Sequence, residues 1–142
     1  MKDANPYCGC LYFSSNALAR TLTKLGEDAF SSTGLSPSHA FLLMAALRTP
    51  GIQPMVLSNQ LLLTPSTITR LIEKLEARGL VMRKTEGKST KVYPTSDGKK
   101  MEKSLKDCWS GLYRKYSEVL GEKNSKALTD EIYKATVTLD GM

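Results

Sequence analysis

The chain has 142 residues, of which 41% are hydrophobic and 24% are charged, as is usual for one globular domain. Its net charge of +6 favours a polyanionic partner such as nucleic acid, although a basic surface can also serve solubility alone. The longest apolar run, Ala40 to Leu47, is too short to cross a membrane, and the N-terminus has no apolar signal core. We therefore expect a cytoplasmic protein without a membrane partner. With one histidine in the whole chain, a histidine-based catalytic or zinc site is disfavoured, so we expect no enzyme, no cofactor and no bound metal.

Helices are predicted over most of the first 61 residues. Between Leu11 and Phe30 the apolar residues recur at near multiples of 3.6, which predicts a long amphipathic helix. Ser36 and Pro37 are typical of an N-cap followed by proline at the first helical position. They begin a nearly all-apolar helix over 37–48, which the Pro50–Gly51 pair ends, and a short helix follows over 54–61.

A second clear helix start lies at Thr64 and Pro65. Thr64 can cap this helix, which we expect to run to about Arg78 and to end at Gly79. One face is apolar and is expected to be buried; it consists of Ile68, Leu71, Ile72 and Leu75. The other face is polar and is left for solvent or a ligand; it consists of Ser66, Thr67, Thr69, Arg70, Glu73 and Lys74.

Two short β-prone runs, 80–82 and 90–93, flank a basic segment with Gly87 at the expected turn, which predicts a hairpin with a basic tip. Thr95 or Ser96 then caps a predicted long helix. Its apolar stripe is spaced nearly like a coiled-coil seam and comprises Met101, Leu105, Cys108, Leu112, Tyr116 and Val119. Gly121 ends this helix. A last helix carries the stripe Leu128, Ile132, Ala135 and Leu139.

The order of short helix, tight turn, second helix and basic hairpin over 54–93 is typical of a winged helix-turn-helix. In that motif the second helix enters the major groove of DNA, so its outer face needs short hydrogen-bonding side chains and a long basic one. Ser66, Thr67, Thr69 and Arg70 supply this set near a helix N-terminus, which itself favours phosphate. The alternative is an ordinary polar outer face without a ligand.

The segment LTPSTITRLIEKLEARGLV over 63–81 resembles the recognition helix and first strand of MarR-family regulators, and VYPTSDG over 92–98 resembles the exit from their wing. The resemblance implies a single domain over 1–142, mainly α with a small β-hairpin wing. Its DNA-binding lobe would cover about 36–95, flanked by dimerisation helices over about 1–35 and 96–142. It also implies a homodimeric repressor of a palindromic double-stranded operator, released by a small-molecule or oxidative signal.

The resemblance assigns DNA contacts to residues of the second helix and the hairpin. They are Pro65, Ser66, Thr67, Thr69, Arg70, Lys74, Lys84, Lys88 and Lys91. One departure concerns the wing, where the family often carries aspartate, one residue and then arginine. This chain has Glu86, Gly87 and Lys88 there, and lysine lacks the planar fork with which arginine enters a narrow minor groove.

Cys8 falls where some peroxide-sensing relatives carry a reactive cysteine, and Cys10 follows two residues later. A helix start supports a thiolate. In those relatives tyrosines support the thiolate, and the corresponding residues here are Leu22, Ser36 and His39. The support of a Cys8 thiolate is therefore missing or changed in this chain. Buried structural thiols, a redox switch and a metal site all remain open for the cysteines. Two other functions compete with DNA binding, namely a thiol enzyme or metal-binding protein using Cys8 and Cys10, and a winged helix that binds only protein.

Overall fold

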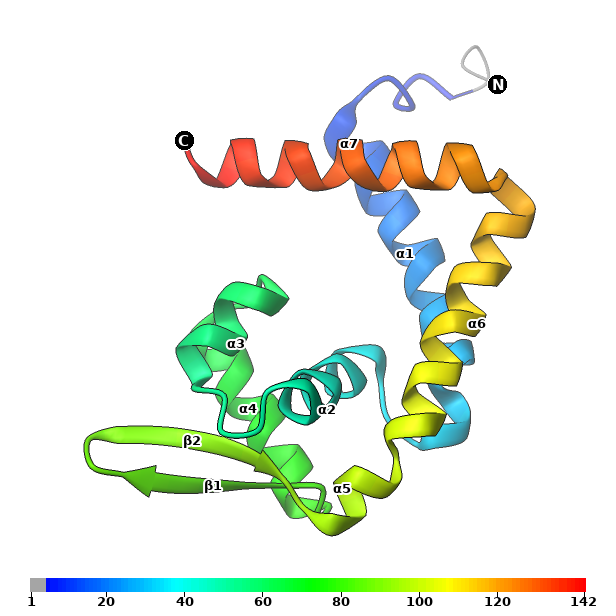
Figure 1. Cartoon of the computed structure of the whole chain (residues 1–142). Coiled ribbons are helices and arrows are strands. Elements are labelled where there is room, and N and C mark those ends of the chain that lie inside the picture. Colours follow the sequence, from blue (N-terminus) through cyan, green and yellow to red (C-terminus); the bar gives the residue numbers. More distant parts are fainter. Residues whose placement is uncertain (1–4) are drawn as a thin grey trace.

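The computed structural model describes residues 5–142 and is mainly helical with one β-hairpin, which confirms the predicted fold class (Figure 1). The elements in chain order are α1 (Leu11–Phe30), the 3-10 turn η2 (Ser31–Thr33), α2 (Pro37–Arg48), α3 (Pro54–Leu61), α4 (Pro65–Ala77), β1 (Val81–Glu86), β2 (Ser89–Pro94), α5 (Ser96–Lys100), α6 (Glu102–Leu120) and α7 (Glu122–Asp140).

The elements form two parts. One is a lobe of α2, α3, α4, α5 and the hairpin; the other consists of the long helices α1 and α6, which pack side by side, and α7, which lies across their far end (Figure 1). The lobe joins the long helices mainly through α2, which contacts both α1 and α6. No helix in residues 5–142 combines the length and apolar character that a membrane span requires.

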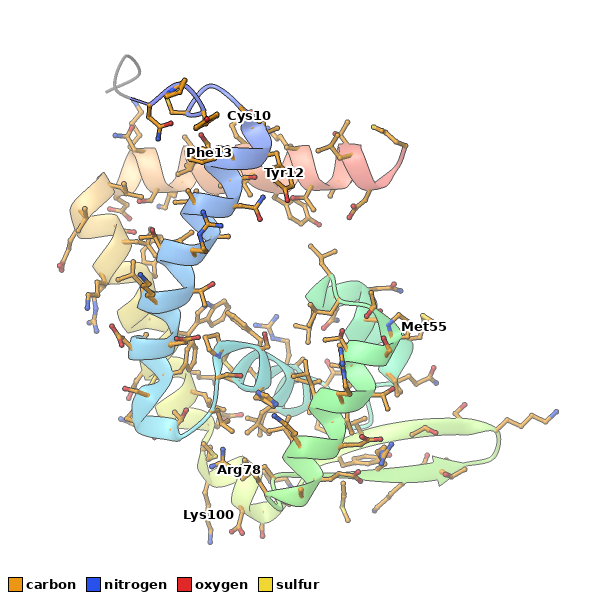
Figure 2. The ribbon with its side chains drawn as sticks, turned by 180° about the vertical axis from the view of Figure 1, so that it is seen from behind. Cys10, Tyr12, Phe13, Met55, Arg78 and Lys100 are labelled. Atoms are coloured by element: carbon orange, nitrogen blue, oxygen red, sulfur yellow. The ribbon has the colours of Figure 1, made fainter. Side chains whose placement is uncertain are left out.

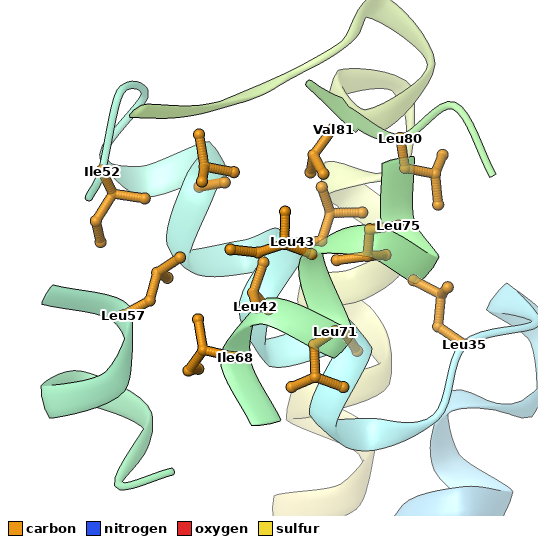
Figure 3. Close-up of a cluster of buried hydrophobic side chains, with 14 of the residues drawn as sticks. Leu35, Leu42, Leu43, Ile52, Leu57, Ile68, Leu71, Leu75, Leu80 and Val81 are labelled. Atoms are coloured by element: carbon orange, nitrogen blue, oxygen red, sulfur yellow. The ribbon is translucent and has the colours of Figure 1, made fainter. Parts of the chain in front are cut away.

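The core of the lobe is a cluster of aliphatic side chains from α2, α3, α4 and the hairpin (Figure 3). Leu42 and Leu43 of α2 are fully buried, and the apolar face of α4 packs around them as its periodicity predicts. Leu105 of α6 and Phe30 of α1 belong to the same cluster and have no exposed surface. The lobe and the first turns of α6 therefore share one core, which fixes the base of the lobe on the long helices.

The N-terminus of α2 differs from the prediction in one respect. Ser36 occupies the N-cap position, but its hydroxyl makes no hydrogen bond to a backbone N–H of α2 and instead pairs with Nδ1 of His39. Pro37 at the first helical position has no N–H to satisfy, and the imidazole three residues on lies within reach of the Ser36 hydroxyl. The helix thus begins as predicted, without the predicted side-chain cap.

The hairpin is longer than the two apolar runs suggested. β1 and β2 pair in antiparallel register from Val81 opposite Pro94 to Glu86 opposite Ser89, with a two-residue turn at Gly87 and Lys88. Gly87 has φ of +64°, a left-handed conformation in which glycine has no steric penalty. Ile52 adds a single bridge to Val92, so the base of the hairpin is also joined to the α2–α3 loop.

The predicted long helix after the hairpin is divided into α5 and α6 at Met101. Thr95 caps α5 by accepting from the Gly98 N–H, and the Met101 N–H bonds to Gly98 rather than continuing the α-helical pattern. Gly98 lies against the Leu80 carbonyl, closely enough that a Cβ would stand 2.2 Å from that oxygen. Contact with Leu80, the residue before β1, therefore fixes the direction of α5, while Leu105 must turn toward the core.

Part of the apolar stripes predicted for the long helices is not covered in the single chain. Val119, on the stripe predicted for the helix after the hairpin, is 82% exposed, and Leu11 is 69% exposed. The C-terminal half of α7, from here on called its outer half, carries Ile132, Tyr133 and Val137, each between 45% and 58% exposed. The physical reason is that α7 packs chiefly against α6, which leaves the rest of α7 without a covering element.

Candidate nucleic-acid interface

The predicted recognition helix is α4, and its start is fixed by local hydrogen bonds. Thr64 caps it by accepting from the Thr67 N–H at 3.3 Å, and Pro65 stands at the first position, both as expected. The preceding turn has Leu62 in the left-handed region, with φ of +55°. The buried Ser58 hydroxyl donates to the Leu63 carbonyl, which holds this turn on α3. The two helices of the motif are therefore fixed relative to each other.

The outer face of α4 is solvent-exposed at Ser66, Thr69, Arg70 and Lys74, while Thr67 is half-buried. Two of these side chains are held by hydrogen bonds within α4. Thr69 donates to the Pro65 carbonyl at 3.0 Å, so its hydroxyl bends back onto the helix. An Arg70 Nη2 donates to the Thr67 hydroxyl at 3.3 Å, which holds the guanidinium against the helix. The face thus presents short polar groups around one oriented guanidinium.

The hairpin places its charged side chains on two faces. Lys84, Glu86, Lys91 and Tyr93 share one face by strand alternation and register. Glu86 forms an ion pair with Lys91 at 3.0 Å, and the Tyr93 hydroxyl donates to the other Glu86 oxygen at 2.9 Å. The hydrogen bond from Lys91, and to a smaller extent that from Tyr93, lowers the pKa of Glu86. The hydrogen bond between Lys91 and Glu86 also raises the pKa of Lys91. Lys88 at the tip is exposed and makes no ion pair with any described residue.

Two residues that the sequence analysis did not select connect these elements. Arg83 of β1 binds Glu76 of α4 through two guanidinium nitrogens, at 2.9 and 2.8 Å, and the Arg83 N–H donates to the same carboxylate at 3.1 Å. At the end of α4, Arg78 donates to the Gly34 carbonyl at 2.6 Å and so reaches the linker that follows α1. Opposite charges seven residues apart are a poor sequence signal, because the pairing requires the turn at Gly79 to bring β1 back along α4.

The cysteines lie away from this surface. Cys10 stands at the N-cap of α1, beside Tyr12, at the opposite end of the molecule from the hairpin (Figure 2). Cys10 is exposed and Cys8 half-buried, and both are free thiols. Cys108 is half-buried on α6, 3.6 Å from the Ser32 hydroxyl. Residues 5–142 contain no cluster of three or more His, Cys, Asp or Glu side chains suited to a metal ion.

A groove lies between the lobe and α6. It consists of two adjoining hollows of about 330 and 220 Å³, which share Met44, Arg48 and Trp109 as lining residues. Phe41 adds an aromatic wall, since its ring meets that of Trp109 edge-to-face at 5.9 Å. The groove therefore combines aromatic and aliphatic walls with the Arg48 guanidinium, a composition suited to an organic anion.

The sequence model of the MarR family matches residues 33–89, whereas no match was found among curated protein sequences. Three solved structures are similar over most of their lengths. A MarR regulator from Methanosarcina mazei Go1 is 23% identical, with 93% of this chain and 91% of that chain covered and a TM-score of 0.74. CouR from Rhodococcus jostii RHA1, bound to p-coumaroyl-CoA, is 21% identical, with 86% and 88% covered and a TM-score of 0.73. The transcriptional repressor CouR bound to a 23-mer DNA duplex is 17% identical, with 93% and 96% covered and a TM-score of 0.83.

The matched segment contains α2 to β1, which is the part of the chain that carries the recognition helix. The structural similarity extends beyond it to the long helices, because the coverage reaches 93% of the chain. Residues 33–89 thus match the MarR-family model by sequence, and the chain as a whole has the winged helix-turn-helix fold seen in solved structures of MarR-family regulators.

Proposed function

We propose that this protein is a sequence-specific regulator that binds double-stranded DNA as a homodimer and acts as a repressor. The observation that carries the proposal is the exposed polar face of α4, with its oriented Arg70, beside a basic hairpin. The similar repressor bound to a DNA duplex supports it. A thiol enzyme or metal carrier would leave these exposed basic residues without a role, as would a winged helix that binds only protein.

In this proposal α4 enters the major groove and the hairpin lies along the adjacent backbone and minor groove. Arg70 reads a base edge, with Ser66, Thr67 and Thr69 around it, and Pro65 places the helix N-terminus toward phosphate. Lys74, Lys84, Lys88 and Lys91 supply charge for the phosphates, and Lys88, at the hairpin tip, is the residue placed for the minor groove. Lysine provides charge there with less geometric selectivity than arginine would.

The homodimer is proposed from the apolar surface left open on α1 and α7. Leu11 and Tyr12 at the start of α1 are 69% and 79% exposed, and the outer half of α7 adds a continuous row of exposed apolar side chains. A second copy of the chain would cover both, since soluble monomers rarely expose apolar patches of this extent. Two recognition helices related by a two-fold axis would then read a palindrome with half-sites about one helical turn apart, on the order of 34–36 Å.

Replacing Arg70 by alanine tests the base-reading role. We expect the operator, recovered by selection from random duplexes with the purified protein, to bind about 1–3 kcal/mol more weakly, because a bidentate contact to a base edge is lost. Lys88→Ala should instead weaken binding to all sequences and reduce the slope of log K against log salt by about one. Lys103→Ala removes one charge from the outer surface of α6 and serves as the control. An Arg70→Ala variant with unchanged sequence preference would remove Arg70 from base reading.

For the release signal we propose a small organic anion held in the groove between the lobe and α6. Arg48 would bind its anionic group, and Phe41 and Trp109 would pack on its apolar body. The ligand would bias the angle between the lobe and α6, and so the spacing of the two recognition helices. The similar repressor that binds p-coumaroyl-CoA supports a small-molecule signal. The oxidative alternative, through Cys8 with Cys10 as a neighbouring thiol, would act on the start of α1 in the proposed dimer interface.

One set of binding measurements separates the two signals. Trp109 is the only tryptophan of the chain, so ligand binding in the groove should quench its fluorescence. We expect aromatic carboxylates or acyl-CoA esters to do so and to lower operator affinity, with both effects lost in Arg48→Ala. If organic hydroperoxide releases the DNA from wild type but not from Cys8→Ser, while no such ligand acts, the oxidative signal replaces the small molecule.

A further inference from the structure

The hairpin face that carries Lys84, Glu86, Lys91 and Tyr93 contains one acidic group among its basic ones. Lys84 and Lys91 stand directly opposite each other across the strands, a like-charge pairing that is unfavourable by itself. Glu86 compensates for this, because one carboxylate oxygen lies 3.0 Å from the Lys91 ammonium and the other accepts from the Tyr93 hydroxyl. The Lys84 ammonium in turn lies 5.2 Å from the centre of the Tyr93 ring. All four side chains therefore form one contiguous network.

This network affects what the hairpin offers to DNA. A lysine contributes to DNA binding by displacing counterions from phosphates, and the contribution is independent of sequence. The Lys91 charge is already paired with Glu86, so a phosphate must compete with a carboxylate held on the same strand face. A phosphate brought close to this face also meets the negative charge of Glu86 itself.

We propose that Glu86 is a specificity-determining residue, which penalises binding of the wing to arbitrary duplexes more than binding to the operator. The inference rests on the proposed DNA-binding function. Non-specific complexes depend on phosphate contacts alone, so an acidic group in the wing removes a large share of their affinity. In the operator complex the base contacts of α4 hold the wing in one position, with Lys88 at its tip toward the minor groove, so the ion pair of Glu86 with Lys91 can stay intact and the penalty is smaller than in a non-specific complex. A residue that weakens binding to non-operator DNA raises specificity without adding a contact to the operator.

Glu86→Gln tests this role. The amide keeps the size of the side chain and an acceptor for the Tyr93 hydroxyl, but it removes the negative charge and releases Lys91. We expect the affinity for a random-sequence duplex to rise about tenfold, and the slope of log K against log salt to steepen by about one. The affinity for the operator should rise less, so that the ratio of the two affinities falls.

Two comparisons make the result specific. Glu118→Gln makes the same change of charge on an exposed position of α6 and should leave both the slope and the ratio unchanged. Lys91→Ala added to Glu86→Gln should cancel most of the gain in non-specific affinity, because the released charge is then absent. Thermal unfolding of each variant checks that the substitutions at Glu86 and Lys91 leave the protein folded.

The outcomes separate this inference from the proposed function. If Glu86→Gln has the wild-type slope and ratio, or binds both duplexes more weakly, Glu86 only supports the hairpin and the inference is overturned while DNA binding stands. If wild type binds neither duplex in a salt-dependent way, the DNA-binding function fails, and the role of Glu86 fails with it.

Discussion

Replacing Gly98 by alanine is expected to destabilise the protein by about 2–4 kcal/mol, although it adds only one methyl group. The added Cβ would stand 2.2 Å from the Leu80 carbonyl oxygen and 3.3 Å from a Leu43 methyl group. The contact is with backbone, so no side-chain rotation can relieve it, and α5 must move away from Leu80. Urea unfolding followed by circular dichroism, at one fixed protein concentration, measures the change.

Gly111→Ala in α6 is the matched control. The nearest atom to its added Cβ is an Arg114 nitrogen at 3.7 Å, which is an ordinary contact. Alanine there should stabilise the helix by about 0.5–1 kcal/mol, because glycine loses more conformational freedom on folding. Equal effects of the two substitutions would show that α5 does not approach the Leu80 backbone as closely as the structure places it.

The double substitution Tyr133→Glu with Val137→Glu is expected to dissociate the proposed homodimer. These residues lie one helical turn apart on α7 and are 58% and 50% exposed in the single chain. Replacing them should therefore change the folding stability of the protomer little. In a dimer they would be covered, and burying two carboxylates there is unfavourable. We expect the dissociation constant to rise at least about a hundredfold, which corresponds to about 2.7 kcal/mol, as measured by sedimentation. Operator affinity should fall with it, because each half-site is then bound separately.

Val56→Glu serves as the control for oligomeric state, since Val56 is an exposed apolar residue on α3, outside the three long helices. It should leave the sedimentation of the protein unchanged. A wild-type protein that sediments as a monomer, or a double variant that stays dimeric, would contradict the dimer formed through α7.

The candidate interface was predictable to different degrees in its two halves. On α4 the cap follows from the residue type of Thr64, and the buried stripe from Ile68 to Leu75 and the exposed Arg70 follow from helical periodicity. In the hairpin the basic residues were predicted, but their partners were not. The ion pair of Glu86 with Lys91 depends on a register that no apolar pattern fixes in this polar segment, and of the residues of β1 beyond Met82 only Thr85 is β-prone.

The sequence by itself determined the order of the helices, the start and buried face of α4, and the basic character of the hairpin. Each of these is a local property, set by a cap, a glycine or proline, or the spacing of apolar side chains over one or two turns. Only the tertiary structure decided the break between α5 and α6, the attachment of Arg83 to Glu76 and the exposure of Val119 and the outer half of α7. These depend on what packs against an element from a distant part of the chain, and side-chain spacing within one element does not contain that information.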